Sequence, residues 1–359
     1  MLPPIARSEQ LSQLATMLRI RRFEEALIEL AATHDVGHFH VYVGQEATGV
    51  PALALLGDGD VTYTTHRNHG HLIARGVDPA RMLAEILGRS SGTNGGKGGT
   101  LHLASTAHGF PTTSSSVGGP LPIAVGSAFA FRELGLDRVS VCLFGDGALE
   151  EGAWHEAANI AALRQLPVIF LCENNSLEAL GQKANEYPSS TLASARLVDL
   201  VTPFGIPTSV VDGTDAAAVH EAMTAAIERA RGGGGPTFLE AQTVRWPGSR
   251  PLWPQLVTGR TEVPFAWDEA GIPEAHRTWI GGQDALLRYV RELVAAGVAH
   301  EDVVALDEAA SAEMDAAVAF ALESPFPATS AAYADVFGDP RVNAAVGPRP
   351  VGRPAAAEA

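Results

Sequence analysis

The pattern of apolar and polar residues divides the chain into short apolar runs and longer segments with helical periodicity. The clearest unit spans residues 139–175, where apolar runs at residues 139–144 and 168–172 flank a segment with helical spacing. Short apolar runs on either side of an amphipathic helix are typical of parallel strands that are buried on both faces. We therefore predict a strand, a helix and a second, parallel strand in this stretch.

The same alternation extends along most of the chain. Helical spacing is found at residues 8–33, 79–87, 122–132, 197–204, 216–231, 284–296 and 311–321, and strand patterns at 208–211 and 237–244. Ser8 is placed to cap the first helix, because a serine hydroxyl can accept a hydrogen bond from the backbone at a helix start. Strands that alternate with helices predict an α/β fold with a doubly wound, mainly parallel sheet covered on both faces.

This pattern suggests a division of the chain into five parts. They are a helical segment at residues 1–35, an α/β domain at 36–250, a loop at 251–280, a helical extension at 281–340 and a flexible tail at 341–359. The loop lacks periodicity and is rich in Pro and Trp, while the tail is rich in Pro and Ala.

Composition changes this picture mainly by exclusion. The chain has 359 residues, a formal net charge of −16 and 46% hydrophobic residues, which describes an ordinary globular protein. The acidic balance argues against nucleic acid, whose phosphates are bound through Lys and Arg clusters. We expect no membrane span and no signal peptide, because no apolar run is long enough. Cys142 and Cys172 lie in predicted buried strands, so we expect free thiols and a cytoplasmic location.

Polar residues follow both strands of the 139–175 unit. Gly145-Asp146-Gly147 comes directly after the first strand, and Asn175 comes just after the second. Because the carboxyl ends of parallel strands meet at one edge of a sheet, we expect Asp146 and Asn175 to lie close together. A carboxylate and an amide oxygen suit Mg²⁺, which keeps other positions for phosphate and water. A second Gly-Asp-Gly, at residues 57–59, has no strand before it and no Asn pair after it.

This unit resembles the thiamine-diphosphate (ThDP) binding motif. Nearly the whole chain resembles the alpha subunit of the heterotetrameric ThDP-dependent 2-oxo acid dehydrogenases. The matching blocks are residues 39–47 (FHVYVGQEA), 64–76 (TTHRNHGHLIARG), 95–102 (GGKGGTLH), 117–124, 284–297 and 333–338 (YADVFG). The 64–76 block is most similar to the acetoin dehydrogenase form. The resemblance implies a ThDP-binding fold with helical extensions, and an enzyme that decarboxylates a 2-oxo acid, with pyruvate as the expected substrate.

The resemblance also implies roles for individual residues. Asp146 and Asn175 would ligate Mg²⁺, with the Leu177 carbonyl as a third ligand. Contacts to ThDP would come from these residues and from His66, Arg67, Ser115, Val117, Gly145, Gly147 and Ala148. Arg67 would clamp the diphosphate, since a guanidinium pairs with phosphate oxygens in a fixed fork, whereas the alternative is a solvated surface arginine.

Two of the five histidines between residues 38 and 71 resemble active-site residues. His40 and His69 resemble the histidines that face the substrate carboxylate or the developing intermediate, a role that suits a side chain whose charge changes near neutral pH. The alternative is a zinc site. No Cys or acidic ligand lies near these histidines in the sequence, so we favour the catalytic interpretation.

One departure from the family pattern affects the choice of acceptor. Relatives carry Arg-Gly-His-Ser after the strand equivalent to residues 237–244, whereas residues 245–250 read RWPGSR here, so the loop histidine is missing at Ser249. In the family that histidine assists transfer to a lipoyl group. Two hypotheses stay open: a dehydrogenase component that feeds a lipoyl acyltransferase, and a biosynthetic homologue that hands a two-carbon unit to another acceptor.

A second departure concerns the partner. The resemblance implies that the glutamate that activates ThDP lies on a beta subunit, and no residue of this chain is identified as its replacement. We therefore expect an obligate assembly with two copies of each subunit. The intact Asp and Asn pattern argues against a non-catalytic paralogue. A nicotinamide oxidoreductase is disfavoured because no G-x-G-x-x-G follows the first strand.

Overall fold

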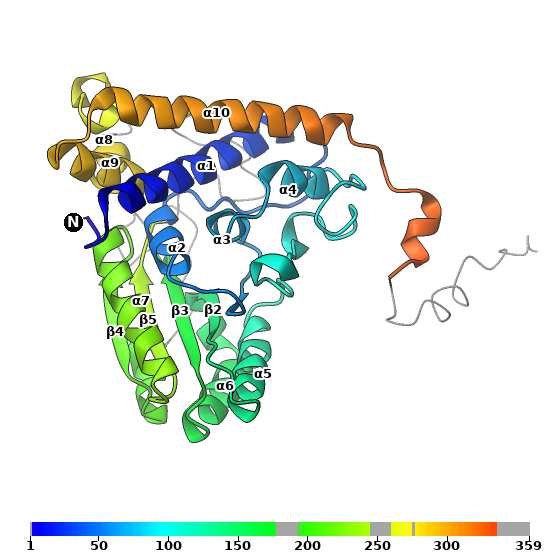
Figure 1. Cartoon of the computed structure of the whole chain (residues 1–359), viewed down its shortest axis with the longest axis vertical. Helices are drawn as coiled ribbons and strands as arrows, with labels where there is room; N and C mark the ends of the chain where they lie inside the picture. Colours follow the sequence, from blue (N-terminus) through cyan, green and yellow to red (C-terminus); the bar gives the residue numbers. More distant parts are fainter. Residues whose placement is uncertain (1, 177–192, 195, 245–259, 275–276, 336–359) are drawn as a thin grey trace, which may run out of the picture.

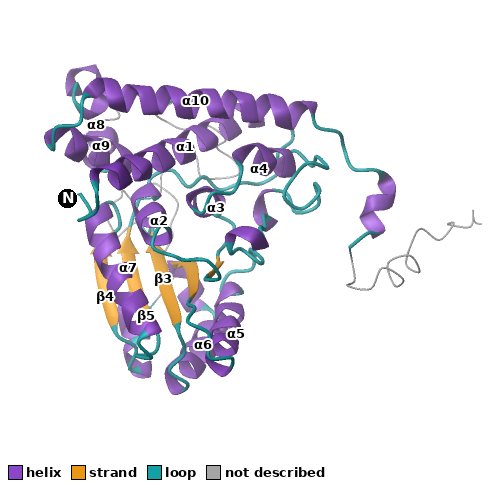
Figure 2. Ribbon diagram, in the orientation of Figure 1, coloured by secondary structure: helices purple, strands orange, loops and turns teal. Residues whose placement is uncertain are grey.

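Five parallel strands form the centre of the molecule in the residues that the computed structural model describes, namely 2–176, 193–194, 196–244, 260–274 and 277–335. The strands are β1 (Val61–Tyr63), β2 (Ser140–Gly145), β3 (Val168–Asn174), β4 (Thr208–Asp212) and β5 (Thr237–Gln242), in the order β1–β2–β3–β5–β4 (Figure 2). All neighbouring pairs are parallel. The sheet confirms the predicted α/β fold class.

The apolar runs of β2 and β3 are explained by burial on both sides of the sheet. Val141, Leu143 and Ile169 belong to one apolar layer, which includes α2 (Glu46–Leu53) and α7 (Ala216–Arg231). Successive side chains of a strand point to opposite faces. The residues that alternate with them, such as Cys142 and Phe170, therefore belong to the opposite layer, with α5 (Pro120–Glu133) and α6 (Gly152–Leu163). Both cysteines are free and buried, as predicted.

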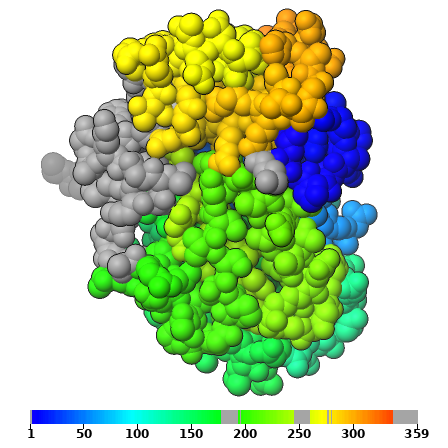
Figure 3. Space-filling model, turned by 90° about the vertical axis from the view of Figure 1, so that its left-hand side faces the viewer, coloured from blue at the N-terminus to red at the C-terminus, as the bar shows by residue number. Residues whose placement is uncertain are grey.

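A layer of helices, drawn mainly from the two ends of the chain, lies over the carboxyl edge of the sheet (Figure 1). It contains α1 (Arg7–Ala31), α3 (His69–Ala74), α4 (Pro79–Ile86), α8 (Arg277–Gly282), α9 (Ala285–Ala295) and α10 (His300–Glu323). The first and last of these, α1 and α10, lie side by side, joined by Arg19–Glu313 and Arg22–Asp307 ion pairs of 2.7 Å. Figure 3 shows the N-terminal segment (blue) beside the C-terminal helices (yellow to orange) at the upper end of the molecule. No helix in the described ranges combines the length and apolar character needed to cross a bilayer.

Short 3₁₀ helices connect these elements. They are η1 (Thr100–His102), η2 (Thr106–His108), η3 (Asp146–Glu150), η4 (Leu197–Leu200), η5 (Thr202–Phe204), η6 (Val263–Ala266), η7 (Glu269–Gly271) and η9 (Thr329–Tyr333). The single helix expected at residues 197–204 is two of these pieces. The reason is Pro203, whose ring removes the backbone N–H that a continuous helix needs.

Some boundaries differ from the prediction. Helix α1 begins one residue before Ser8, so the predicted serine cap is wrong; Glu9 Oε2 instead accepts the backbone N–H of Ala6 at 3.0 Å. Strand β1 and helices α2 and α3 were not recognised, because each is short and lies among Gly turns. Two 3₁₀ helices lie within residues 251–280, and α8 begins there at Arg277, where we expected only a loop. The tail at 341–359 lies outside the described residues.

Candidate active site

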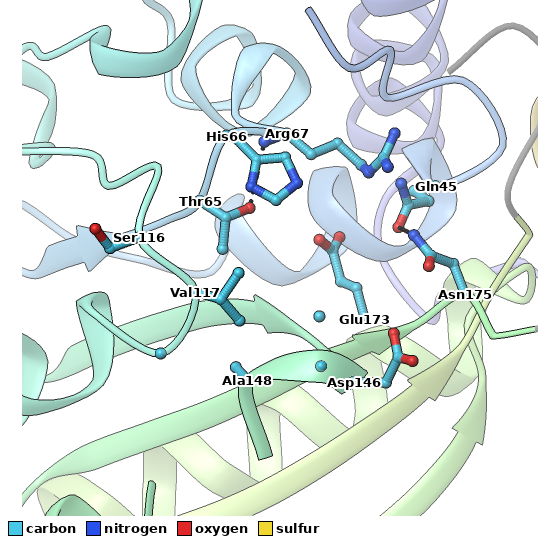
Figure 4. A pocket seen from close by; sticks show the side chains of 13 residues that line it. Gln45, Thr65, His66, Arg67, Ser116, Val117, Asp146, Ala148, Glu173 and Asn175 are labelled. Carbon is cyan, nitrogen blue, oxygen red and sulfur yellow. Dashed lines mark hydrogen bonds between the residues drawn. The ribbon is translucent and has the colours of Figure 1, made fainter. Parts of the chain in front are cut away.

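A hollow opens at the carboxyl edge of the sheet, where β2 and β3 end side by side. Gly145 of β2 is level with Glu173 of β3, so both chains leave the sheet at the same place. The hollow is lined by Gln45, Thr65, His66, Arg67, Ser116, Val117, Gly118, Gly145, Asp146, Gly147, Ala148, Glu173 and Asn175 (Figure 4). Most of the cofactor residues expected from the sequence therefore lie around one cavity, although they come from four separate segments.

The residues predicted to bind the metal, Asp146 and Asn175, both line this hollow and are both buried. Asn175 Nδ2 donates to Gln45 Oε1 at 3.4 Å. The neighbouring Asn174 turns the other way, and its Nδ2 donates to Glu240 at 2.8 Å, so only one member of the Asn pair faces the cavity. A carboxylate and an amide at one edge form an oxygen-rich donor set of the kind that Mg²⁺ prefers. Leu177, the expected third ligand, lies outside the described residues, as does Ser249.

Arg67 and His66 line the opposite side of the hollow from the ends of the strands (Figure 4). Arg67 is buried and its guanidinium donates to the Val41 carbonyl, which holds the side chain in place and does not match a solvated surface arginine. The His66 ring packs against His40, with ring centroids 4.5 Å apart. His40 is not one of the residues that line the hollow, but it is next to one that does.

His69 and Ser115 are not among the residues that line the cavity. His69 is fully buried, with Nδ1 3.0 Å from the Glu24 carboxylate and Nε2 2.8 Å from the Thr100 hydroxyl. Both ring nitrogens are therefore occupied by contacts that join α1, α3 and η1. Ser115 is exposed, and the two residues after it line the hollow instead.

The zinc alternative for the histidines finds no support in the described ranges. No group of three or more His, Cys, Asp or Glu side chains in those ranges is arranged to hold a metal ion. His71 is instead fully buried, with Nδ1 2.7 Å from the Thr64 hydroxyl and Nε2 3.0 Å from the Tyr42 hydroxyl.

Comparison with known proteins identifies the family. The family described as "Dehydrogenase E1 component" matches residues 15–250 of the chain. The chain belongs to the dehydrogenase E1 component family. The pyruvate dehydrogenase E1 component subunit alpha of Zymomonas mobilis is 38% identical, over 93% of this chain and 92% of that protein. The acetoin:2,6-dichlorophenolindophenol oxidoreductase alpha subunits of Cupriavidus necator and Bacillus subtilis are each 36% identical. They cover 93% and 89% of this chain, and 96% and 91% of their own lengths. These matches confirm the predicted resemblance to the alpha subunits of pyruvate and acetoin dehydrogenases.

One residue of this E1 chain, Glu173, received no role from the sequence although it faces the hollow. It accepts a hydrogen bond from the Tyr42 hydroxyl, and its Oε1 lies 3.2 Å from His71 Nε2. Burial, reinforced by the Glu173 carboxylate, raises the pKa of Tyr42 well above its usual range, so Tyr42 stays protonated as a donor. The position of Glu173 could have indicated this role, because it lies at the carboxyl end of β3, next to the Asn pair that was predicted to reach the site.

In the E1 chain, the backbone of the Gly-rich stretch at residues 92–100 (GTNGGKGGT) binds a side chain of the chain itself. Its backbone wraps the buried carboxylate of Glu85 on α4, which accepts N–H groups from Asn94, Gly96 and Gly98 at 2.7, 2.8 and 2.6 Å. Because backbone N–H groups of this kind are well suited to anions, the stretch is occupied by an anion of the chain itself. These contacts therefore hold the Gly-rich stretch against α4.

Proposed function

We propose that this chain is the alpha subunit of a ThDP- and Mg²⁺-dependent enzyme that decarboxylates a 2-oxo acid and transfers the resulting acyl or hydroxyalkyl unit. The observation that carries the proposal is the gathering of Asp146, Asn175 and Arg67 around one buried hollow at the carboxyl edge of the sheet. The names of the relatives support pyruvate or acetoin as the class of substrate. We favour pyruvate.

The residues of the hollow fit a diphosphate with its cation. Asp146 and Asn175 offer oxygens for the metal, and Arg67 offers a guanidinium held in place by the Val41 carbonyl. The Nε2 group of Gln45 is buried and has no hydrogen-bond partner among the described residues, which leaves a donor for a ligand oxygen. A Cβ at Gly147 would meet no atom within 4 Å, so this glycine leaves the cavity floor open.

Bound ThDP would supply the carbanion chemistry of decarboxylation, and the chain's own residues would position it and exclude water. Asp146 and Asn175 would hold the cation, while Arg67 would pair with a phosphate oxygen in a fixed geometry. Val117 presents an apolar side chain at the mouth of the hollow, next to the backbone that would meet the cofactor ring. His40 would face the substrate carboxylate, and its ring packs against that of His66, which would contact the cofactor.

An exposed apolar surface on α5 and α6 supports the expected beta-type partner. We call it the α5–α6 face; its exposed apolar side chains are Ile123, Phe129, Ile160 and Leu163, with Val117 at the rim of the hollow. Residues 120–131 contain no charged residue, although one side of this helix is exposed. A helix that is apolar all round is normally buried. Because this face adjoins the hollow, a subunit docked here could also complete the active site.

Calorimetry with Mg²⁺ and ThDP tests this proposal on the chain co-purified with its beta-type partner. We expect Asp146→Ala to lower the affinity for ThDP by more than about tenfold, or about 1.4 kcal/mol, because a cation ligand is lost. Asp58→Ala is the matched control, since Asp58 belongs to the exposed second Gly-Asp-Gly. Equal affinity of Asp146→Ala and the native protein would overturn the assignment. The alpha chain alone should show no turnover.

The acceptor of the two-carbon unit is the second part of the proposal. The replacement of the family's loop histidine by Ser249 favours an acceptor other than a lipoyl group. We therefore expect the assembled enzyme to consume pyruvate with an artificial electron acceptor but to acylate an isolated lipoyl domain poorly. Fast acylation of that domain would assign the chain to the lipoyl-dependent dehydrogenases instead.

A further inference from the structure

Gln45 stands at the start of α2, yet its side chain does not cap that helix. Its backbone is fully used, because its N–H donates to the Tyr42 carbonyl at 3.2 Å and its own carbonyl accepts the N–H of Thr48 at 2.9 Å. The side chain makes no cap hydrogen bond, is 1% exposed and lines the hollow instead. A long amide turned away from the helix end and into a cavity requires another explanation.

The two ends of this amide face different parts of the site. Oε1 accepts a hydrogen bond from Asn175 Nδ2 at 3.4 Å, while Nε2 is buried without a partner in the described part of the chain. Figure 4 shows the Gln45 amide between Arg67 and Asn175, so it lies between the residue expected to hold the anion and the one expected to hold the cation. A buried donor without a partner is costly, and a bound acceptor would relieve that cost.

We propose that Gln45 is a positioning residue of the cofactor site, which couples the cation side to the diphosphate side. By accepting the Asn175 N–H, Gln45 fixes the orientation of the neighbouring amide, so that Asn175 Oδ1 is presented to the cation. Its own Nε2 then donates to an oxygen of the bound diphosphate. This inference rests on the proposed function, because it assigns a role towards the same cofactor.

The orientation of the Gln45 and Asn175 amides determines which atom of Asn175 faces the cation. If both amides were turned over, Gln45 Nε2 would donate to Asn175 Oδ1, and Asn175 would present its NH₂ group to the cation. An NH₂ group cannot ligate Mg²⁺. The orientation seen in the structure is therefore the one compatible with a metal ligand, and Gln45 selects it in the way that outer-shell partners orient metal ligands elsewhere.

Two substitutions separate the roles of the two ends. Gln45→Met keeps the length of the side chain but removes both hydrogen bonds, so we expect the dissociation constant of ThDP and the Mg²⁺ concentration for half-saturation both to rise about 10- to 100-fold. Gln45→Glu keeps an acceptor for Asn175 but loses the donor. It should raise the dissociation constant of ThDP and leave the half-saturating Mg²⁺ concentration near that of the native protein. Both constants are measured by calorimetry on the chain with its beta-type partner.

A stability measurement distinguishes positioning from a structural role. Since Nε2 has no partner before the cofactor binds and the bond from Asn175 to Oε1 is long, at 3.4 Å, Gln45→Met should change the melting temperature of the cofactor-free protein little, while reducing the increase that Mg²⁺ and ThDP produce. Gln242→Met is the matched control. Gln242 Nε2 donates to Glu240 at 3.3 Å at the same sheet edge but does not line the hollow, so this variant should bind like the native protein.

The measurements on Gln45→Met and Asp146→Ala together distinguish a failure of the Gln45 role from a failure of the proposed function. Native affinity for ThDP in Gln45→Met, with binding lost in Asp146→Ala, would overturn the role of Gln45 alone. Native affinity in Asp146→Ala would overturn the proposed function itself. A lower melting temperature of cofactor-free Gln45→Met, together with an unchanged increase on binding, would show a structural role and also overturn this inference.

Discussion

Tyr42 is a fully buried side chain near the site, and two glycines make room for it. A Cβ at Gly70 would lie 2.0 Å from Tyr42 Cδ1, and one at Gly49 would lie 2.5 Å from the Tyr42 hydroxyl. The hydroxyl in turn contacts Glu173, on the floor of the hollow. Both glycines are therefore required by packing, and each fixes the place of a ring that holds a residue of the site.

Gly70→Ala tests this packing. The added methyl group has no room beside the Tyr42 ring, so we expect the free energy of unfolding to fall by about 1–3 kcal/mol in urea denaturation. Gly126→Ala, also within a helix, is the control, because a Cβ there meets nothing within 4 Å. It should stabilise the chain by about 0.5–1 kcal/mol through helix propensity. A loss in Gly126→Ala equal to that in Gly70→Ala would contradict the argument.

The sequence could indicate some residues of the site and not others, for a physical reason. Asp146 and Asn175 follow from a local pattern, because the ends of adjacent parallel strands must share an edge. Gln45 and Glu173 take their importance from contacts between segments far apart in the chain, which no local period encodes. His69 stays a predicted active-site residue, although its ring nitrogens contact Glu24 and Thr100, which its sequence context did not indicate.

At the scale of elements, a buried ion cluster joins three helices. Arg21 of α1 donates to Glu46 of α2 at 2.8 Å and to Asp284, the N-cap of α9, at 2.9 Å. Burial lowers the pKa of Arg21, but the two carboxylates outweigh it and hold that pKa well above its usual range. The cluster therefore specifies how the N-terminal and C-terminal helices meet above the sheet.

Arg21→Met should weaken this junction strongly. Two carboxylates would remain buried without their cation, which we expect to cost about 3–5 kcal/mol of unfolding free energy at pH 7. Unpaired buried carboxylates have raised pKa values in the folded state, so the folded variant gains protons as the pH falls, and the deficit should shrink from pH 7 to pH 5. Urea denaturation at both pH values measures this.

Arg19→Met is the control for Arg21→Met. The Arg19–Glu313 pair joins α1 to α10 but is partly exposed, so its loss should cost about 1 kcal/mol or less at either pH. Equal losses of unfolding free energy in the two variants would show that the buried cluster does not stabilise the contact between these helices. A deficit in Arg21→Met that does not change with pH would show the same.

Element prediction from the sequence succeeded where the apolar period is long. The boundaries of β3 and α7 were recovered within two residues, because a core on both faces of the sheet imposes uninterrupted apolar runs. The short α2 was missed. It contains Pro51 and is buried throughout, so it shows no amphipathic period. The pattern at residues 311–321 covered only part of α10, although Val303, Val304 and Leu306 already follow its polar first residues, 300–302.

At the scale of the whole molecule, the α5–α6 face is the surface that most requires a partner. We expect Ile123→Asp to weaken association with the beta-type subunit by more than about tenfold, because it would bury a charge against an apolar surface. Size-exclusion chromatography with light scattering on mixtures of the two subunits measures this. Ala225→Asp, at an exposed position of α7, is the control and should assemble normally. An Ile123→Asp complex as stable as the native one would place the docking surface elsewhere.

The pairing of α1 with α10 has a consequence for how the protein is made. The apolar side of α1, which carries Leu14, Met17 and Leu18, leaves the ribosome long before its partner helix has been translated. Contacts between segments so distant in the chain close late and slowly. Until then this apolar surface is exposed to chaperones and to other nascent chains. Folding of the chain is therefore complete only after α10 has been translated and has packed against α1.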